Sequence, residues 1–350
     1  MRRLKRMAGL VAAVVLVLSS AAAPAAFAEE SAGTPDPMEQ EPGIPNSAAG
    51  ILYETTTGTV LFEENADEVR APASMTKVMT AIIVLEENPE LEGTLTVSED
   101  AVSSYYCSSM TPTYHLEAGE EISYKDCMQY MLVCSANEAA TSFAFELGDG
   151  DFHAFVDMMN EKAKELGCEN TSYMDPTGIS SSNKITARDM VKIAEYAMTF
   201  DAFREAVSHE SGTIPPSNVR DEGYDYYTTN YVMFPDDRYE SPYSQYMTGV
   251  KTGWIPASGY NFTGCLEKDG YQFISVVMGG EELPYDEERI IQGDFVDTIS
   301  LYKLTDDFEP PADYTWIYIA AAAVIAGIAA GVAAVKIKEK KKKTEEKETR

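Results

Sequence analysis

The chain has few of the residues on which metal and nucleic-acid chemistry depend. Only three of its 350 residues are histidines, and they lie too far apart in the sequence to form a local zinc motif. Lysine and arginine number 27 against 57 aspartates and glutamates, which gives a formal net charge of −30 at pH 7. A field of this sign repels phosphate groups. We therefore expect no metal or other cofactor and no nucleic-acid partner.

Cysteine is also scarce. The chain has five cysteines, and no two of them form a Cys-x-x-Cys motif. Because five is an odd number, at least one thiol is left without a partner in the same chain. The simplest interpretation is that these residues are small, buried apolar side chains without a function. They are Cys107, Cys127, Cys134, Cys168 and Cys265.

The N-terminus has the three parts of a secretory signal peptide. Four basic residues within the first six are followed by an apolar stretch and then by Ala26-Phe27-Ala28, a small-x-small cleavage site. We predict that residues 1–28 are removed on export and that the mature chain begins near Glu29. Residues 29–48 are rich in proline, glutamate and glycine and have little to bury, so we expect a flexible leader.

A long uncharged run lies near the C-terminus. As a helix, residues 316–335 would be about 30 Å long, which is enough to span a bilayer. Aromatic residues precede the run and a cluster of lysines follows it, as at the two faces of a membrane. A buried alanine-rich helix is the alternative. We predict a linker over 306–314, a single transmembrane helix over 315–335 and a basic cytoplasmic tail over 336–350, with the preceding domain outside the cell.

The residues between 49 and 305 predict one α/β domain. Two short runs at its start and three near its end are rich in β-branched and aromatic residues, whereas the middle is mostly helical. We expect a five-stranded antiparallel sheet flanked by helices, plus a helical subdomain. A helix over 285–302 should cover the sheet. The expected strands are 49–53, 59–62, 246–252, 259–265 and 271–278.

Ser74 and Lys77 lie at the start of a predicted buried helix. At a spacing of three residues their side chains share one helix face, so the lysine Nζ can reach the serine Oγ. Residues 78–85 are apolar on nearly all sides, which is typical of a central helix. A nucleophile beside a base on a stiff helix suits covalent catalysis. Alone, however, the Ser-x-x-Lys pattern also fits an ordinary helix surface.

Two more patterns follow in order, Ser135-x-Asn137 and Lys251-Thr252-Gly253. Together with Ser74-x-x-Lys77 they form the set found in penicillin-binding proteins and class A β-lactamases. Over nearly the whole exported domain the chain resembles the D-alanyl-D-alanine carboxypeptidases, which are low-molecular-mass penicillin-binding proteins. Other matching segments are Met159-Asn160, Asp175-Pro176-Thr177-Gly178, Thr186-Ala187-Arg188-Asp189-Met190 and Gly259-Tyr260-Asn261.

This resemblance implies a β-lactamase/transpeptidase-like fold and serine-type acyl transfer. Two positions depart from the usual family pattern, since Glu138 stands where the family usually has aspartate and Met75 where it often has threonine. By resemblance, Ser74 attacks the carbonyl between two D-alanines, Lys77 takes its proton, and Ser135 relays the proton to the departing D-alanine. Lys77 must then be neutral, so its pKa must fall from about 10.4 to near 7. Burial and a second cation, for which Lys251 is the candidate, can supply this decrease.

The remaining site residues are expected to bind the substrate. By resemblance, Asn137 hydrogen-bonds the substrate backbone, while Lys251 and Thr252 hold the terminal carboxylate. Gly253 lets the substrate lie close to its strand. The backbone N–H groups of Ser74 and Trp254 would stabilise the oxyanion, and the Trp254 side chain is either a rim contact or simple packing.

The resemblance implies removal of the terminal D-alanine from peptidoglycan stem peptides, with β-lactams as covalent inhibitors. One alternative is a DD-endopeptidase of the same chemistry, and another is a non-catalytic module that binds the cell wall or β-lactams. A β-lactamase would need a deacylating glutamate, and no Glu-x-x-Leu-Asn segment lies between Asn137 and Lys251. The expected partners are therefore a stem pentapeptide that ends in D-Ala-D-Ala, β-lactams and the membrane. The oligomeric state stays open.

Overall fold

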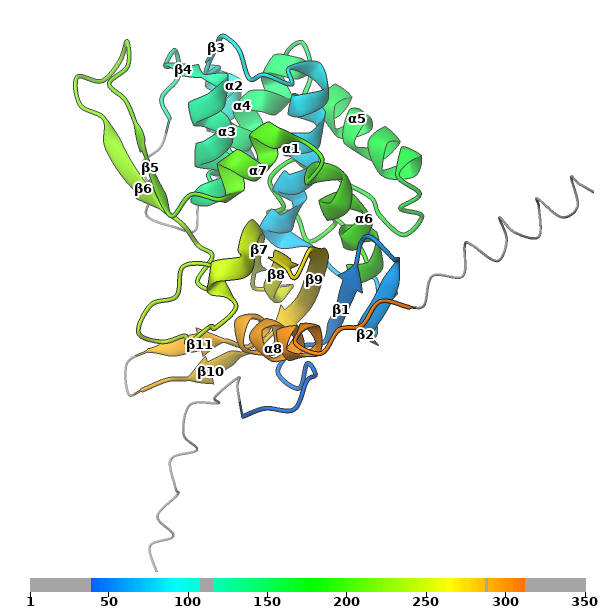
Figure 1. Cartoon of the computed structure of the whole chain (residues 1–350). Helices are drawn as coiled ribbons and strands as arrows, with labels where there is room; N and C mark the ends of the chain where they lie inside the picture. The colour runs from blue at the N-terminus through cyan, green and yellow to red at the C-terminus, as the bar shows by residue number, and fades with distance from the viewer. Residues whose placement is uncertain (1–38, 108–115, 287–288, 312–350) are drawn as a thin grey trace, which may run out of the picture.

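A computed structural model describes residues 39–107, 116–286 and 289–311 of the chain (Figure 1). The predicted signal peptide, residues 29–38 of the leader, residues 312–314 of the linker, the transmembrane helix and the basic tail lie outside these ranges. Within these ranges, no helix is both long enough and apolar enough to cross a membrane.

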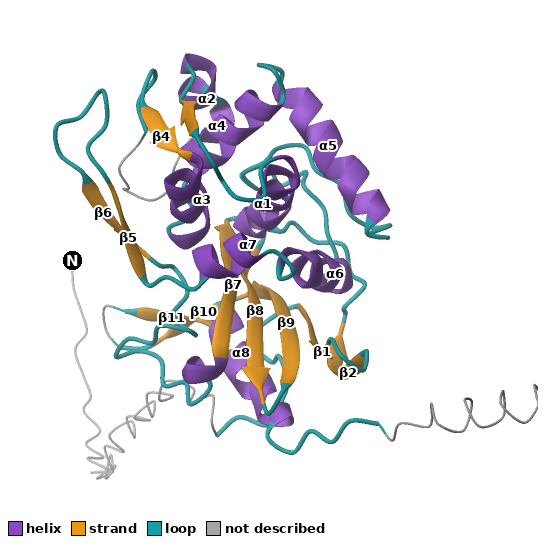
Figure 2. Cartoon of the chain, turned by 45° about the horizontal axis from the view of Figure 1, so that its top comes forward, coloured by secondary structure: helices purple, strands orange, loops and turns teal. Residues whose placement is uncertain are grey.

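The centre of the fold is a five-stranded antiparallel sheet in the order β2-β1-β9-β8-β7 (Figure 2). Two early and three late strands therefore form one sheet, as predicted. Asp269 and Gly270 both have positive φ, so the β8–β9 connection is the predicted tight turn. The strands are β1 (Ala49–Glu54), β2 (Thr59–Glu64), β7 (Met247–Ile255), β8 (Gly259–Lys268) and β9 (Tyr271–Gly280).

Helices cover both faces of the sheet, as predicted. Successive strand residues point to opposite faces. Val276 accordingly packs in the apolar cluster that includes α6 (Ala187–Ala197), whereas Val277 packs in the cluster that includes α8 (Gly293–Tyr302). The sheet is thus buried on both sides.

The helical subdomain is built around α1 (Thr76–Glu87). Every α1 residue through Leu85 is buried, as expected for a helix that is apolar on nearly all sides. Capping side chains fix several of its neighbours, for example Ser123, whose hydroxyl accepts from the N–H of Asp126. The surrounding helices are α2 (Glu99–Ser103), α3 (Tyr124–Val133), α4 (Asn137–Leu147), α5 (Phe152–Glu165) and α7 (Asp201–Val207).

Short two-stranded ribbons lie outside the main sheet. They pair β3 (Thr94–Thr96) with β4 (Glu121–Ser123), β5 (Ser211–Ile214) with β6 (Tyr224–Tyr227), and β10 (Glu282–Pro284) with β11 (Ile290–Gln292). The last ribbon corrects the helix predicted over 285–302, which begins only at Gly293. Ile291 is buried from a strand, so its helical spacing to Phe295 is coincidental.

The described end of the predicted leader packs on the domain. Ile44 is buried in the cluster beneath α8, and the backbone N–H of Asn46 donates to the Asp297 carboxylate at 3.1 Å. The Gln40 side chain donates to the same carboxylate at 3.1 Å. Residues 39–48 therefore belong to the domain, because polar side chains bind the backbone and side chains of this segment to α8.

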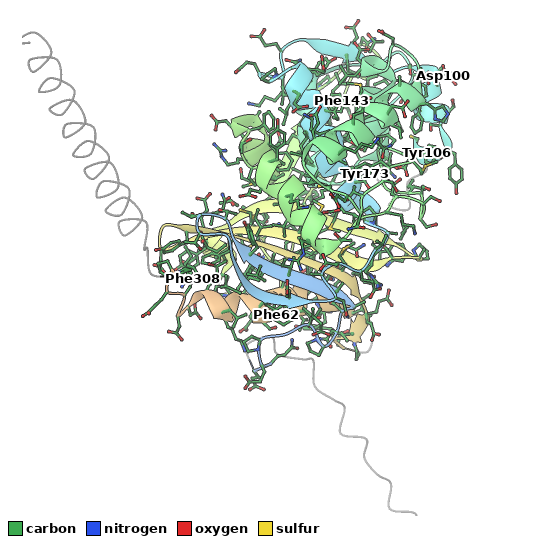
Figure 3. All side chains as sticks on the ribbon, turned by 90° about the vertical axis from the view of Figure 1, so that its right-hand side faces the viewer. Phe62, Asp100, Tyr106, Phe143, Tyr173 and Phe308 are labelled. Atoms are coloured by element: carbon green, nitrogen blue, oxygen red, sulfur yellow. The ribbon has the colours of Figure 1, made fainter. Side chains whose placement is uncertain are left out.

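The start of the predicted linker also packs on the domain. Phe308 contacts the rings of Tyr271 and Phe273 edge-on, with centroid separations of 5.1 and 5.3 Å. Figure 3 shows Phe308 beside the sheet, with Phe143 and Tyr173 in the helical half. The domain thus extends from residue 39 to at least residue 308. All five cysteines are buried, as predicted, and all five are free.

Candidate active site

The three short patterns meet at a cleft between the helical subdomain and the edge strand β7. Ser74 lies in η1 (Ala73–Met75), the 3₁₀ turn that precedes α1, and Ser135 lies between α3 and α4. Both residues line a cavity of about 420 Å³, together with Asn137, Thr252 and Gly253. The fold therefore brings together residues that are up to 180 positions apart in sequence, roughly the span from η1 to β7.

Lys77 is positioned to act on Ser74. Its Nζ lies 2.9 Å from Ser74 Oγ and also donates to Asn137 Oδ1 at 2.7 Å and to the Thr177 carbonyl at 2.8 Å. Complete burial lowers its pKa from 10.5 to about 7, although the nearby carboxylates of Asp175 and Glu138 act in the opposite direction. A neutral Lys77 is thus accessible near neutral pH.

Lys251 was expected to lower the pKa of Lys77, and the structure does not bear this out. Lys251 is buried, and its Nζ donates to the Thr252 carbonyl at 3.1 Å. Burial is the main cause that lowers its pKa well below the usual value, and the charge of Lys77 adds to this decrease. The pKa of Lys77 is lowered by burial. The repulsion between the two lysines therefore lowers the pKa of Lys251 and not that of Lys77.

The turn Asp175-Pro176-Thr177-Gly178 supports the Ser74–Lys77 pair from behind. The buried Asp175 carboxylate accepts from the N–H groups of Thr177, Gly178 and Ser180 at 2.7 to 3.0 Å, and from the Thr177 hydroxyl at 2.6 Å. This network directs the Thr177 carbonyl to Lys77. The sequence comparison identified the tetrapeptide as a matching segment but gave it no role.

Gly178 makes a close approach that no other residue could make. Its φ is +88°, and an added Cβ would lie 1.8 Å from the Ala73 carbonyl oxygen. Ala73 is buried and itself has a φ of +48°, a conformation that costs a non-glycine residue about 1 kcal/mol. The turn therefore holds a strained backbone directly before the candidate nucleophile.

Gly253 approaches η1 from the other side. A Cβ there would lie 2.8 Å from the Pro72 carbonyl oxygen and 2.9 Å from the Ser74 nitrogen. The expectation was that this glycine makes room for substrate, whereas the close neighbour in the structure is the backbone of the chain itself. The packing sets the N–H of Ser74 beside strand β7, which carries the N–H of Trp254.

Ser135 and Asn137 reach the cleft from the junction of α3 and α4. Ser135 has a φ of +69°, so the chain turns sharply at this residue. Asn137 was expected to bind the substrate backbone, and in the structure its Oδ1 accepts from Lys77. Asn137 thus also orients the candidate base.

Thr229 is a cleft residue that the sequence did not reveal. Its hydroxyl lies 2.5 Å from that of Thr252, and both residues line the cleft. The two hydroxyls are suited to donate hydrogen bonds to a carboxylate. No short pattern surrounds Thr229, so only the fold could identify it. The Trp254 side chain is 37% exposed at the rim of the cleft, with its ring 5.9 Å from that of Tyr260.

The fold and this arrangement define the class of active-site serine enzymes that carry the Ser-x-x-Lys, Ser-x-Asn and Lys-Thr-Gly patterns. No group of histidine, cysteine or acidic side chains that could hold a metal occurs among the described residues. The model of the D-alanyl-D-alanine carboxypeptidase family, peptidase family S11, matches residues 36–282. The chain therefore belongs to this family.

Individual relatives agree with this assignment. The chain is 30% identical over 263 residues to the D-alanyl-D-alanine carboxypeptidase DacF of Bacillus subtilis, covering 73% of this chain and 62% of that protein. It is 36% identical over 185 residues to the D-alanyl-D-alanine endopeptidase of Pseudomonas aeruginosa, covering 53% of this chain and 57% of the relative. The chain thus spans about six tenths of the length of these relatives.

A solved structure shows the same fold. The crystal structure of the Streptomyces K15 DD-transpeptidase superposes with a TM-score of 0.66 at 24% sequence identity. The match covers 77% of this chain and 100% of that chain. At this level of identity the comparison supports the β-lactamase/transpeptidase-like architecture that was predicted.

Proposed function

We propose that the chain is a serine-type D-Ala-D-Ala carboxypeptidase that removes the terminal D-alanine from peptidoglycan stem peptides. The observation that carries this proposal is the 2.9 Å contact between Ser74 Oγ and the fully buried Nζ of Lys77. A lysine whose pKa is about 7 can take a proton from a serine at neutral pH, whereas an exposed lysine cannot. β-Lactams would acylate the same serine.

In the proposed reaction Ser74 Oγ attacks the carbonyl carbon of the penultimate D-alanine and transfers its proton to Lys77 Nζ. The developing oxyanion accepts hydrogen bonds from the backbone N–H groups of Ser74 and Trp254. Loss of one such donor typically lowers the rate by a factor on the order of 10² to 10³. Ser135 passes the proton to the amine of the departing D-alanine. Water then hydrolyses the ester on Ser74 and regenerates the serine hydroxyl.

Selection of a free C-terminus is assigned to the other end of the cleft. The hydroxyls of Thr252 and Thr229 would donate to the terminal carboxylate, and the buried Lys251 contacts the backbone carbonyl of Thr252. Binding of the anion would favour the charged form of Lys251, because an opposite charge offsets the cost of burial. A peptide with a blocked C-terminus would lose these contacts.

A DD-endopeptidase is the second candidate, and the similarity to the Pseudomonas aeruginosa endopeptidase favours it specifically. The bond cut is chemically the same, but the leaving amine belongs to a cross-linked peptide. A non-catalytic binding module is a poorer fit. Such a module has no need for a buried Lys77 in contact with Ser74, a serine that lines the cleft.

Free D-alanine distinguishes these functions. The purified full chain is incubated with a stem pentapeptide and, separately, with a cross-linked dimer. A carboxypeptidase releases D-alanine from the pentapeptide, an endopeptidase divides the dimer, and a binding module does neither. Ser74→Ala should abolish both the hydrolysis and the covalent labelling by a fluorescent penicillin. Equal labelling of this variant and the wild type would contradict the proposal.

We further propose, from the sequence, that the domain acts outside the cell membrane. Residues 1–28 would direct export, residues 315–335 would anchor the chain, and the tail would stay in the cytoplasm. The test is protease treatment of intact cells, which should remove the domain and spare the lysine-rich tail. Cleavage of the tail from outside would invert this topology.

A further inference from the structure

Three side chains from different strands form one end of the cleft. Trp254 on β7 and Tyr260 on β8 are directly paired across the two strands, and their rings lie 5.9 Å apart. The Tyr260 hydroxyl donates to Glu282 Oε1 on β10 at 2.9 Å. All three residues line the cleft. Together they form a surface with two aromatic rings and a carboxylate at its edge, which we name the Glu282 platform.

The direction of a bound peptide places its acyl side at this platform. The terminal carboxylate belongs at Thr252, and the scissile carbonyl belongs near the N–H groups of Ser74 and Trp254. The residues before the scissile bond must then continue past Trp254 toward Ile255, where the exposed edge of β7 can pair with an extended chain. At about 3.3 Å per residue, the residue that precedes the D-Ala-D-Ala pair lies one residue beyond the penultimate D-alanine, so its side chain can extend over the platform.

The charge of the platform is negative and available. Glu282 is the only charged side chain among the described residues that line the cleft, because Lys77 and Lys251 are buried and do not line it. In the described part of the chain the Glu282 carboxylate is exposed, accepts from a neutral phenol and takes part in no salt bridge. It can therefore receive a cation without first giving one up.

We propose that Glu282 makes the enzyme select peptides whose residue before D-Ala-D-Ala carries a side-chain primary amine in its free, charged form. This inference rests on the proposed peptidase function and specifies its substrate. The apolar stem of such a side chain would lie on the rings of Trp254 and Tyr260 while the ammonium reaches the carboxylate. Acylation of the amine, as in a bond to a second peptide, removes the charge and hence the preference. Glu282 would thus favour stems that are not cross-linked through this amine.

The test compares three peptides on the full chain. They are Nα-acetyl-L-lysyl-D-Ala-D-Ala, its Nε-acetylated form, and the analogue in which norleucine replaces lysine. Release of D-alanine gives kcat/KM for each. Because the ion pair is solvent-exposed, we expect wild type to prefer the free amine roughly five-fold over norleucine, with the preference declining as salt rises. Glu282→Gln should bring this ratio close to one, and Glu282→Lys should invert it.

The neighbouring acid provides a matched control. Glu281 is exposed directly before β10, does not line the cleft, and bonds Asn46 and Gly293 through its backbone. Glu281→Gln should therefore keep the wild-type ratio. The inference is overturned if wild type treats the three peptides alike, or if Glu282→Gln lowers all three rates and keeps their ratio. If wild type releases no D-alanine from any peptide, the proposed function itself fails, and the inference fails with it.

Discussion

Asn137 Oδ1 lies 2.7 Å from Lys77 Nζ, so a side chain from the start of α4 holds the candidate base of α1. The oxygen of an amide accepts this hydrogen bond without adding charge. An aspartate at the same place would hold the lysine equally well but would stabilise its protonated form. The choice of asparagine is thus consistent with a lysine that must be neutral.

The pH dependence of acylation tests this relationship. In wild type, the rate of acylation by a fluorescent penicillin should rise with pH and level off above about 7, because protonated Lys77 cannot act as a base. Asn137→Asp should raise the Lys77 pKa and move this limb to higher pH, lowering the rate at pH 7 by about ten-fold or more. Gln245→Glu adds the same charge at an exposed position outside the cleft and should leave the profile in place.

The close approach of Gly178 to Ala73 gives a second prediction. Gly178→Ala must displace η1, because the new Cβ would lie 1.8 Å from the Ala73 carbonyl oxygen. A shift of about 1 Å at a nucleophile can cost on the order of 10² in rate, so we expect acylation to fall by about that factor. The measurement is the second-order rate constant for penicillin labelling of folded protein, with folding checked by circular dichroism.

Gly150 is the matched control for this variant. It has a similar φ, +83°, but an added Cβ would meet nothing within 4 Å. Gly150→Ala should therefore show the backbone cost alone, about 1 kcal/mol of stability, and near-normal acylation. Equal acylation rates in the two variants would show that the Gly178 contact does not position Ser74.

Thr229 should affect substrates that carry a free carboxylate. Thr229→Val removes one of the two threonine hydroxyls proposed to bind the carboxylate, and a hydrogen bond to a charged group is worth about 1.5–3 kcal/mol. We expect KM for a D-Ala-D-Ala peptide acid to rise about ten-fold, and the discrimination against the C-terminal amide to shrink accordingly. Thr213→Val removes a comparable hydroxyl from the exposed strand β5 and should change neither value. An unchanged acid-to-amide ratio in Thr229→Val would remove this residue from carboxylate recognition.

Asp294 predicts a pH-dependent stability. Burial raises the pKa of this carboxyl from 3.8 to about 8, and among the described residues neither of its side-chain oxygens has a hydrogen-bond partner from another side chain. Folding therefore takes up a proton between about pH 4 and pH 8, so stability falls as pH rises through this window. Asp294→Asn should remove the loss, and above pH 8 it should stabilise the fold by a few kcal/mol, on the order of 1.4 kcal/mol for each pKa unit of the difference.

Chemical denaturation at pH 5 and pH 8.5 measures this effect. Asp297, one helical turn further along α8, provides the contrast because its carboxylate accepts from the side chains of Gln40 and Asn46. Asp297→Asn should destabilise the domain at both pH values, since it replaces an acceptor of several hydrogen bonds. A variant Asp294→Asn that is less stable than wild type at pH 8.5 would contradict the assignment.

The sequence predicted the framework of the site well. The sheet of β1, β2, β7, β8 and β9 follows from β-branched runs and turn residues, which are local signals. The Ser74–Lys77 contact follows from helical spacing alone. The family resemblance then assembled the three patterns, and the fold places them around one cleft.

The supporting residues could not be predicted, because their roles depend on long-range packing. Thr177, Thr229 and Glu282 lie in a turn, a loop and a short ribbon, where no hydrophobic period marks the position of a side chain. The anchoring of residues 39–48 also depends on a distant partner, Asp297, which a composition rich in proline and glycine does not reveal. Likewise, Ile291 has helical spacing to the apolar residues of α8 but lies in the strand β11 that precedes this helix.

Gly178 and Gly253 pack against η1 from two sides. This packing makes the reactivity of Ser74 depend on the cooperative folding of the domain. The two glycines come from separate segments of the chain, and neither segment alone can hold the turn that carries Ser74. Local unfolding of either segment would inactivate Ser74 before the whole domain unfolds. Covalent labelling by a penicillin should therefore report the intact native state, and under the proposed function it would serve as a sensitive assay for correct assembly of this protein in living cells.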